Sequence, residues 1–302
     1  MSTVITPTPI KAPSVSIGMP VFNGERFIRR ALDSLLNQEY KDFEIIISDN
    51  GSTDNTSEIC LEYATTDDRI RFFSHASNRG STWNFREVLN LATGDYFMFA
   101  GCHDLWDPKF LFRCVPILDL EQGVVLAYSL AVEIDLADSP IRRIVGTVDS
   151  RSLSPNRRFR KVLSNINGYP TYGLFRRAIL SDVLPNIPAT ISQDMLLLAE
   201  MSFLGEFAVI EEELFFLRRN SISVHWKRYF QNLQLSHSFF DLLMSYFNLL
   251  KNYQLLISRR TTRPRARIGL LLFVWIVVFR RTFLWVLALG PALISDRYYR
   301  PW

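Results

Sequence analysis

The stretch that decides the fold is SVSIGMPVFNGERFIRRALDSLLNQEYKDFEIIISDNGSTDNT, residues 14–56. It opens with a short apolar run, residues 14–22, that is typical of a buried strand, and continues with apolar residues at helical spacing. A second apolar run, FEIIISD at residues 43–49, is closed by a turn-rich segment, NGSTDNT, before another helical pattern. A strand, a helix and a second strand in this order predict a parallel pair joined by a crossover helix.

The same alternation continues along the chain as far as residue 101. The sequence predicts a helix at 57–64, a strand at 70–75, a helix at 82–92 and a strand at 95–101. Short, continuous apolar strands alternating with helices indicate an α/β domain with a mostly parallel central sheet. In such a domain ligands bind at the carboxyl ends of the strands. Because no Gly-x-Gly-x-x-Gly motif follows the first strand, a dinucleotide-binding fold is disfavoured.

Composition limits the class of protein. The chain has 302 residues, of which 48% are hydrophobic, so one large domain or two smaller ones can bury a core. Its three cysteines contain no Cys-x-x-Cys pair, which argues against a disulfide framework and for a reducing compartment. Residues 1–13 are rich in Pro and Thr and are expected to form a flexible tail without a signal peptide. We therefore expect the catalytic part to be cytoplasmic.

The last eighty residues have a different, helical and aromatic pattern. Two apolar runs, about 268–279 and 282–294, are separated by Arg280 and Arg281, and each is shorter than the about 20 residues that span a bilayer. We expect two short helices lying in the membrane interface, or a shallow hairpin with the arginines at headgroup level. The alternative is a pair of core helices packed on the domain.

Arginines cluster just before these runs, with five of them between residues 259 and 267. Beside apolar segments, such a cluster suggests anionic lipid headgroups, so we expect a peripheral or monotopic protein at the cytoplasmic face of the inner or plasma membrane. Nucleic acid is the weaker alternative, because no known reading motif accompanies the arginines.

The segment AGCHDLWDP, residues 100–108, places Cys102, His103 and Asp104 after a strand. The segment admits three interpretations: a metal-ligand loop, a cysteine–histidine nucleophile pair, or a strand that simply runs into solvent. Adjacent residues of an extended strand point to opposite faces, so we do not expect Cys102 and His103 to hydrogen-bond to each other. Cys102 is more typical of a small buried residue.

Two blocks of sequence together resemble a known family. Residues 20–56 look like the amino-terminal half of a family-2 glycosyltransferase of the GT-A fold, and residues 78–111 are similar to the family's next block. The match covers about Val15 to Phe112 and continues more loosely to about Arg219. The resemblance implies a Rossmann-like α/β/α GT-A domain at residues 14–222, followed by a C-terminal helical region at 223–302.

The resemblance also implies a binding site for a nucleotide-diphosphate sugar. Asp49 would face the nucleotide base, although an Asx turn or helix cap is an equally good interpretation of its position. The Asn-x-Gly turn would offer donors to a phosphate or sugar, although a turn with a helix cap explains Asn78 as well. The remaining residues implied at this site are Pro20, Phe22 (where the family usually has tyrosine), Asn23, Glu25, Asn50, Gly80, Asn84, Cys102 and His103.

Family members hold Mg²⁺ or Mn²⁺ with an acidic motif at the position of His103 and Asp104. Here only Asp104 is acidic, and His103 stands where a metal-binding aspartate is expected. Hard divalent cations prefer oxygen ligands, and imidazole suits Mn²⁺ better than Mg²⁺. We therefore expect a divalent cation at His103 and Asp104, with Mn²⁺ favoured.

Asp194 is the candidate catalytic base implied by the resemblance. It opens the apolar helix MLLLAEMSFLG as part of Gln193-Asp194, where a carboxylate could take the proton of an acceptor hydroxyl. A first-turn aspartate stabilised by the helix dipole is the alternative. Two basic pairs, Arg176–Arg177 and Arg218–Arg219, could neutralise a diphosphate, and the resemblance favours Arg218 and Arg219.

The predicted function is therefore that of an inverting glycosyltransferase that uses a nucleotide-diphosphate sugar and acts on a lipid-linked or polysaccharide acceptor. One alternative is a non-catalytic relative that binds a nucleotide sugar or scaffolds a membrane polysaccharide assembly. A nucleotidyltransferase is disfavoured, because PVFNGERF lacks the glycine- and basic-rich loop that such an enzyme needs after its first strand.

Overall fold

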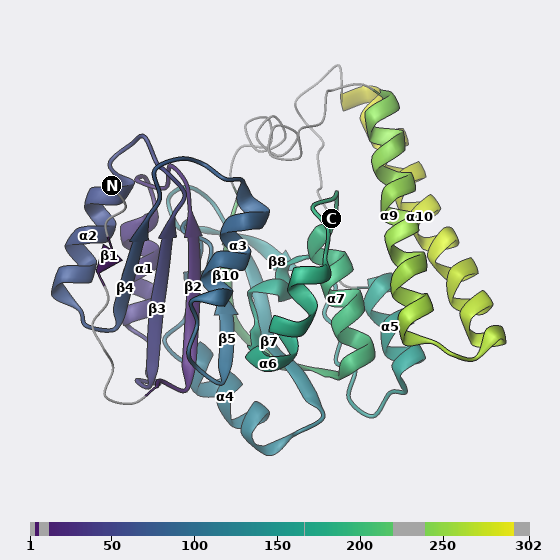
Figure 1. Cartoon of the computed structure of the whole chain (residues 1–302), viewed down its shortest axis with the longest axis horizontal. Helices are drawn as coiled ribbons and strands as arrows, with labels where there is room; N and C mark the ends of the chain where they lie inside the picture. Colours follow the sequence, from purple (N-terminus) through teal and green to yellow (C-terminus); the bar gives the residue numbers. More distant parts are fainter. Residues whose placement is uncertain (1–3, 6–11, 166, 220–238, 293–302) are drawn as a thin grey trace.

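The computed structural model describes residues 4–5, 12–165, 167–219 and 239–292, and it contains one ten-stranded sheet (Figure 1). The strand order is β1-β4-β3-β2-β5-β9-β7-β10-β6, with β8 paired to β7. The strands are β1 (Val4–Ile5), β2 (Val15–Val21), β3 (Phe43–Asp49), β4 (Ile70–Ser74), β5 (Tyr96–Phe99), β6 (Leu105–Trp106), β7 (Val124–Ile134), β8 (Pro140–Ile144), β9 (Leu174–Arg176) and β10 (Glu206–Arg218). The helices are α1 (Ile28–Leu36), α2 (Thr56–Thr66), α3 (Ser81–Asn90), α4 (Phe110–Leu120), α5 (Pro155–Asn165), α6 (Arg177–Val183), α7 (Gln193–Leu204), α9 (Phe239–Arg260) and α10 (Pro264–Ala292).

The first four strands of the predicted α/β unit form its parallel centre. β2 pairs in parallel with β3 and β5, and β3 pairs in parallel with β4. All seven residues of β3 are buried, as expected for a strand covered on both faces by helices. The prediction of an α/β fold with a mostly parallel sheet is confirmed.

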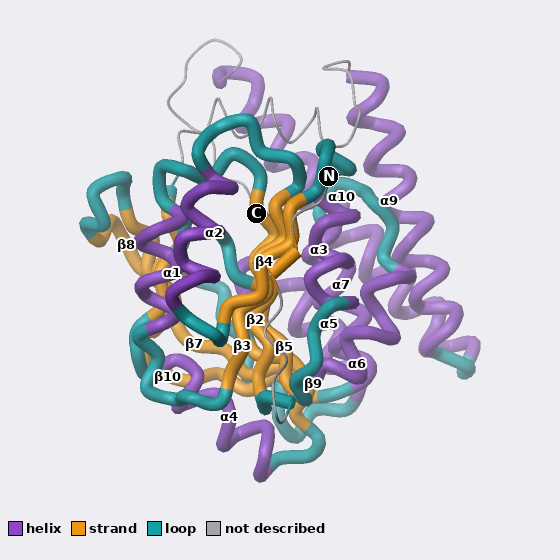
Figure 2. The backbone as a smooth tube through the Cα atoms, turned by 60° about the vertical axis from the view of Figure 1, so that its left-hand side comes forward, coloured by secondary structure: helices purple, strands orange, loops and turns teal. Residues whose placement is uncertain are grey.

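Helices cover both faces of this sheet. In Figure 2, α1 and α2 lie on one face, whereas α3, α5, α6 and α7 lie on the other. α1 buries four apolar side chains at helical spacing against the sheet: Ile28, Ala31, Leu32 and Leu35. The result is the three-layer α/β/α arrangement that the sequence predicted.

The second half of the sheet contains antiparallel strands that the sequence pattern did not predict. β9 is antiparallel to both neighbours, β5 and β7, and joins the two halves of the sheet. β7 and β10 form a long parallel pair, and β10 also pairs with the short strand β6. Because β6 follows Asp104 directly, this pairing brings the end of β10 to the 101–104 segment.

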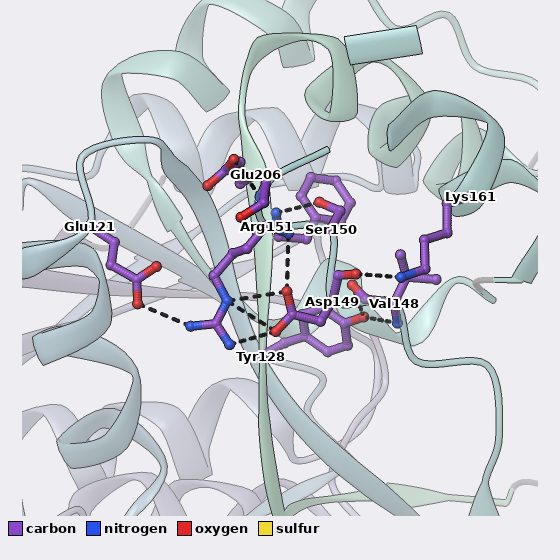
Figure 3. A network of polar contacts seen from close by, with 10 residues as sticks. Glu121, Tyr128, Val148, Asp149, Ser150, Arg151, Lys161 and Glu206 are labelled. Atoms are coloured by element: carbon purple, nitrogen blue, oxygen red, sulfur yellow. Dashed lines mark hydrogen bonds and ion pairs between the residues drawn. The ribbon is translucent and has the colours of Figure 1, made fainter. Parts of the chain in front are cut away.

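A polar network holds the segment between β8 and α5 against the sheet (Figure 3). The Tyr128 hydroxyl accepts a hydrogen bond from the backbone N–H of Val148 at 2.7 Å. Arg151 forms ion pairs with Asp149 at 2.6 Å and with Glu121 at 3.0 Å. These contacts give the irregular segment a defined position beside β7 and α4.

The C-terminal part differs from the expectation of two short helices. Both apolar runs, as far as residue 292, belong to one continuous helix, α10. The reason is that Arg280 and Arg281 interrupt the hydrophobic pattern without interrupting helix propensity, since arginine is a good helix former. α10 packs on α5 and α9 through Leu270, Val274 and Val278, which are buried. No helix in the described part of the chain is long and apolar enough to cross a membrane.

Some of the predicted segments lie wholly or partly outside the described residues. The start of the C-terminal region, residues 223–238, and the end of its second run, residues 293–294, cannot be compared, nor can residues 1–3 and 6–11 of the expected tail. Val4 and Ile5 of that tail form β1, which pairs antiparallel with β4.

Glu44 on β3 forms hydrogen bonds to β2, to β4 and to the loop before β5. These contacts lie at the amino end of the sheet, opposite the candidate site. The buried Glu44 carboxylate accepts hydrogen bonds from Ser16 Oγ at 2.6 Å, Arg71 Nη1 at 2.7 Å and Thr93 Oγ1 at 2.7 Å. Burial acts to raise the pKa of Glu44, but these hydrogen bonds outweigh burial and lower it below its ordinary value.

We expect Glu44→Gln to lower the free energy of unfolding by about 1–3 kcal/mol at pH 7, because buried donors lose their charged acceptor. Since the pKa is lowered in the folded state, the Glu44 contribution is complete above the ordinary value of about 4.3 and is lost as the pH falls through the folded-state value. Urea denaturation from pH 7 to pH 3 should therefore show the two proteins converging in acid.

The matched control is Glu62→Gln, because Glu62 forms an exposed ion pair with Arg29 at 2.6 Å. Exposed pairs contribute little to stability, so this variant should unfold like the wild type at every pH. Equal stability of Glu44→Gln and Glu62→Gln would contradict the role given to Glu44.

Candidate functional site

The candidate site lies where the parallel strands β2, β3 and β5 end. The loops that follow β2 and β3 are bound to each other through two of the predicted binding residues. Asn23 Oδ1 accepts a hydrogen bond from Thr53 N at 2.8 Å, and Glu25 Oε2 accepts one from Asn55 N at 3.0 Å. Asn23 and Glu25 thus fix the two loops, while Pro20 lies inside β2 and Phe22 follows it directly.

Asp49 ends β3 and is completely buried. Its carboxylate accepts hydrogen bonds from the backbone N–H of Ser52 at 3.1 Å and from the hydroxyls of Ser52 and Ser57. These contacts match the Asx-turn interpretation, in which the aspartate organises the turn before α2. A contact between Asp49 and a nucleobase stays a prediction.

The turn before α3 contains three more of the predicted residues. Asn78 Oδ1 accepts hydrogen bonds from Asn50 Nδ2 at 2.9 Å and from Gly80 N at 2.8 Å. Gly80 has a φ of 88°, a conformation that favours glycine, and it stands immediately before the first residue of α3. The predicted turn and helix start are thus confirmed, and Asn50 connects them to the end of β3.

Asn84 corrects one expectation. It is buried, and its amide pairs with β3, donating to the Ser48 carbonyl at 2.9 Å and accepting from the Ser48 hydroxyl at 2.6 Å. An amide with both ends bonded to the protein interior holds α3 on the sheet. We therefore do not retain Asn84 as a residue that contacts the sugar nucleotide.

The Asp104 carboxylate has two unlike oxygens. Oδ1 accepts a hydrogen bond from the backbone N–H of Arg218 at 2.9 Å, whereas Oδ2 is buried and has no hydrogen-bond partner among the described residues. Gly101 leaves room for this carboxylate, because a Cβ there would lie 2.4 Å from Oδ2. A buried carboxylate oxygen without a partner suits a cation, since burying an unpaired charge is costly.

His103 lies beside Asp104, with Nε2 3.7 Å from Asp104 Oδ1. Burial acts to lower the pKa of His103, but the negative charge of Asp104 and the contact with Cys102 together outweigh burial and raise the pKa to about 9. Burial raises the pKa of Asp104, and the charges of His103 and Arg218 oppose that effect. A metal ion binds the neutral imidazole, so binding at His103 would have to release the proton that the raised pKa retains.

The expectation for Cys102 and His103 was wrong in its geometry. Cys102 Sγ lies 3.9 Å from His103 Nδ1, because residues 102–103 form a turn and not an extended strand. Cys102 is partly exposed and packs against the hydrophobic core.

Arg218 also differs from its predicted role at the diphosphate. Its side chain is completely buried: Nε donates to the His103 carbonyl at 2.7 Å, Nη1 donates to the Asp135 carbonyl at 2.7 Å, and Nη2 forms an ion pair with Asp138. The guanidinium also lies over the Phe27 ring, 4.6 Å from its centroid. Arg218 is therefore a positioning residue that holds the corner formed by His103 and Asp104.

The other three candidate arginines contact different parts of the protein. Arg219 is half exposed and pairs with Glu133 on β7 at 3.3 Å. Arg176 donates to the Val124 carbonyl at 2.8 Å, and Arg177 donates to the Gly94 carbonyl. Both carbonyls lie at the amino ends of strands, at the opposite edge of the sheet from Asp104, so Arg176 and Arg177 are excluded from the site.

Asp194 is the second residue of α7, which packs on the short 3₁₀ turn that contains Tyr172. Burial raises the pKa of Tyr172, and the negative charges of Asp104 and Asp194 raise it further. Thr82 donates a hydrogen bond to Gln193 at 3.0 Å, which joins the start of α3 to the start of α7. The structure therefore joins the start of α7, where Asp194 lies, to the start of α3.

Sequence reasoning missed two residues of this arrangement. Tyr172 lies in a short 3₁₀ turn that no periodic pattern marks, and Gly168 gives the Asp194 carboxylate its room, since a Cβ at Gly168 would overlap it. The paired glycines and tyrosines of GYPTYG are the signal that could have indicated a tight, functional turn.

The described residues contain no group of three or more His, Cys, Asp or Glu side chains that could hold a metal ion. Two hollows lined by described residues lie beside α9, away from Asp49 and Asp104. His103 and Asp104 thus supply two metal ligands at most, and further ligands would have to come from a bound phosphate or water.

Comparisons with known proteins show the family and the fold of this chain. The model of the family described as Glycosyl transferase family 2 matches residues 16–184. An uncharacterised glycosyltransferase of Nostoc sp. is 29% identical over 222 residues, which are 70% of this chain and 66% of that protein. A GalNAc(5)-diNAcBac-PP-undecaprenol beta-1,3-glucosyltransferase of Campylobacter jejuni is 34% identical over 30% of each chain. This chain thus matches two thirds or less of the length of these relatives.

Two solved structures share the fold. S. aureus TarS matches with a TM-score of 0.63 and 16% identity, covering 88% of this chain and 72% of that one. The mannosyltransferase PcManGT of Pyrobaculum calidifontis, in complex with GDP-Man and Mn²⁺, matches with a TM-score of 0.55 and 16% identity, covering 90% and 72%. The family match extends over more than half of the residues, and this chain therefore belongs to glycosyltransferase family 2.

Proposed function

We propose that this chain is an inverting glycosyltransferase that moves a sugar from a nucleotide-diphosphate sugar to a hydroxyl of a lipid-linked or polysaccharide acceptor. The observation that carries the proposal is the hydrogen bond from Thr82 to Gln193, which joins the start of α7, where Asp194 lies, to the start of α3. Two relatives support the substrate classes: TarS has been solved in complex with UDP-GlcNAc, and the Campylobacter relative is named for an undecaprenol-linked acceptor.

In this proposal Asp194 is the general base. Its carboxylate accepts the proton of the acceptor hydroxyl while that oxygen bonds to the anomeric carbon, from the face opposite the diphosphate. The bond between the anomeric carbon and the diphosphate oxygen breaks, and the electron pair leaves with the nucleotide diphosphate. The transition state is oxocarbenium-like, as in other glycosyl transfers.

Asp104 and His103 are the residues that would hold a divalent cation, with Mn²⁺ favoured over Mg²⁺. The buried Oδ2 of Asp104, which has no partner among the described residues, fits a cation, and the imidazole of His103 fits Mn²⁺ once it has lost its proton. When bound, such an ion neutralises the charge of the departing diphosphate. Arg218 orients the corner through the His103 carbonyl and its own backbone N–H.

A second candidate function is a non-catalytic relative that binds a nucleotide sugar or scaffolds a polysaccharide assembly at a membrane. Two observations favour it: the described residues offer only two clustered metal ligands at the corner, and the Asp49 carboxylate is already bonded to two serines. The experiments below separate the two functions.

We expect Asp194→Asn to lower kcat by about 10²–10⁴-fold, because the amide cannot take the acceptor proton. Donor binding should be unchanged, since the base contacts the acceptor. Nucleotide release with Mn²⁺ and an acceptor measures the first quantity, and calorimetric titration of the donor measures the second.

The matched control for this loss is Asp182→Asn, an exposed aspartate near the end of the neighbouring helix α6. It should retain wild-type kcat. Full activity of Asp194→Asn would remove Asp194 from the reaction.

Replacement of His103 tests the metal corner. His103→Asp should move the preference from Mn²⁺ toward Mg²⁺, because a second carboxylate supplies the oxygen ligand that Mg²⁺ favours. His103→Ala should raise the Mn²⁺ concentration needed for half-maximal activity. Activity measured over a series of Mn²⁺ and Mg²⁺ concentrations reports both effects, and indifference to both substitutions would exclude His103 from the metal site.

A screen of nucleotide sugars should identify at least one donor that raises the thermal unfolding temperature in the presence of Mn²⁺. Ligands that bind only the folded state stabilise it by mass action, by about 2.7 kcal/mol at a concentration 100 times Kd. Binding of a donor without turnover, whichever acceptor is offered, would favour the non-catalytic function. Absence of binding by every nucleotide sugar would contradict the catalytic function and leave only the scaffold role.

A further inference from the structure

Helix α10 carries a row of exposed apolar side chains on the face opposite its packed face. Ile268, Leu272, Trp275, Ile276 and Phe279 are 47–67% exposed. Their spacing of three, four and one residues places them along one side of an α-helix. We call these five residues the α10 apolar row.

Packing within the protein explains only the other side of the helix. Leu270, Val274 and Val278 are buried where α10 contacts α5 and α9. Figure 1 shows α9 and α10 side by side at the edge of the molecule, with α10 as the outer helix in that view. A row of large exposed apolar residues on an outer helix is typical of an interaction surface.

The charge of the same helical pair indicates the partner. Residues 239–292 contain eight Lys and Arg residues and one acidic residue, Asp241. Arg259, Arg263 and Arg265 are exposed at the turn between α9 and α10, and Arg280 is exposed directly after the α10 apolar row. Basic residues at both ends of an apolar row are complementary to a surface with anionic headgroups and an apolar interior.

We propose that the α10 apolar row docks on an anionic lipid bilayer, with α10 lying in the plane of the membrane. Trp275, Ile276 and Phe279 would enter the boundary between headgroups and acyl chains, while the arginines contact lipid phosphates. A second copy of the chain is a poorer partner, because two such basic helical pairs would repel each other.

Docking of α10 on a bilayer would be compatible with a lipid-linked acceptor. Val277 and Val278 of α10 line a hollow together with Ser192 and Met195, which lie on either side of Asp194 in the chain. Docking of α10 would therefore bring the start of α7 close to the bilayer, where a lipid-linked acceptor is anchored. This consequence rests on the proposed function, whereas membrane binding itself does not.

Flotation with lipid vesicles tests the docking. The full-length protein should bind vesicles of phosphatidylcholine with 30% phosphatidylglycerol and bind pure phosphatidylcholine vesicles at least about tenfold more weakly, since each basic residue near an anionic surface adds about 1 kcal/mol. The triple variant Trp275→Ser, Ile276→Ser, Phe279→Ser should lose binding by about tenfold or more. Arg263→Gln with Arg265→Gln should lose the preference for the anionic lipid.

The matched control replaces exposed apolar residues elsewhere: Phe112→Ser with Leu120→Ser on α4, which are 50% and 83% exposed. This variant should bind vesicles like the wild type. Circular dichroism and thermal unfolding should show that all variants fold, because every replaced side chain is exposed. Asp194→Asn should also bind vesicles like the wild type, so a failed catalytic proposal would leave this result intact.

Three results would overturn the docking proposal. The first is absence of wild-type binding to the anionic vesicles, and the second is wild-type binding by the triple variant. The third is a dimer in light-scattering measurements that the triple variant abolishes, since a second copy would then cover the α10 apolar row.

Discussion

The candidate site depends on one buried cation, the guanidinium of Arg218. Removing an arginine from water costs several kcal/mol unless its N–H groups find partners. Here the partners come from separate segments: the carbonyls of His103 and Asp135, the carboxylate of Asp138, and the face of the Phe27 ring. A single charge thereby sets the relative positions of the loop after β5, the turn after β7 and the start of α1.

The contacts of Arg218 also limit which groups can neutralise the charge of a bound diphosphate. Because its guanidinium is occupied within the protein, it cannot also clamp the phosphates in this arrangement. Its backbone N–H donates to one oxygen of Asp104, and the other oxygen has no hydrogen-bond partner among the described residues. Neutralisation of a leaving diphosphate then falls to the corner of Asp104 and His103, either through a divalent cation or through the imidazolium that Asp104 stabilises.

The parallel half of the fold could be predicted from the sequence because its signals are local. β2, β3 and β5 are short apolar runs separated by helices, and this alternation predicts a parallel sheet even though β5 pairs with β2, about eighty residues earlier. β10 pairs with β7, and β9 enters the sheet antiparallel between β5 and β7. No such alternation marks β9 and β10, so their places in the sheet depend on how the whole chain packs.

The continuous helix α10 shows that a hydrophobic pattern alone does not predict where a helix ends. Arg280 and Arg281 divide two hydrophobic runs, and the division was interpreted as a break between helices. Hydrophobic pattern and helix propensity are separate properties. Arginine interrupts a hydrophobic run, but it is a good helix former and allows the helix to continue. Whether these apolar runs span a membrane, lie on its surface or pack within the protein depends on which face of the helix is buried. The structure provides that burial, and the sequence pattern does not.

The roles of the site residues depend on whether their buried polar atoms already have hydrogen-bond partners within the protein. Asp49 and Asn84 sit at the expected edge, yet their polar atoms already bond to Ser52, Ser57 and Ser48, so they support the loops. Burial compels such bonding, because an unpaired buried polar group costs about 1–3 kcal/mol. Several buried polar atoms have no described partner, and among them the carboxylate oxygen of Asp104 lies at the expected metal position. Asp104 Oδ2 is buried without a described partner, and a bound cation would remove that cost.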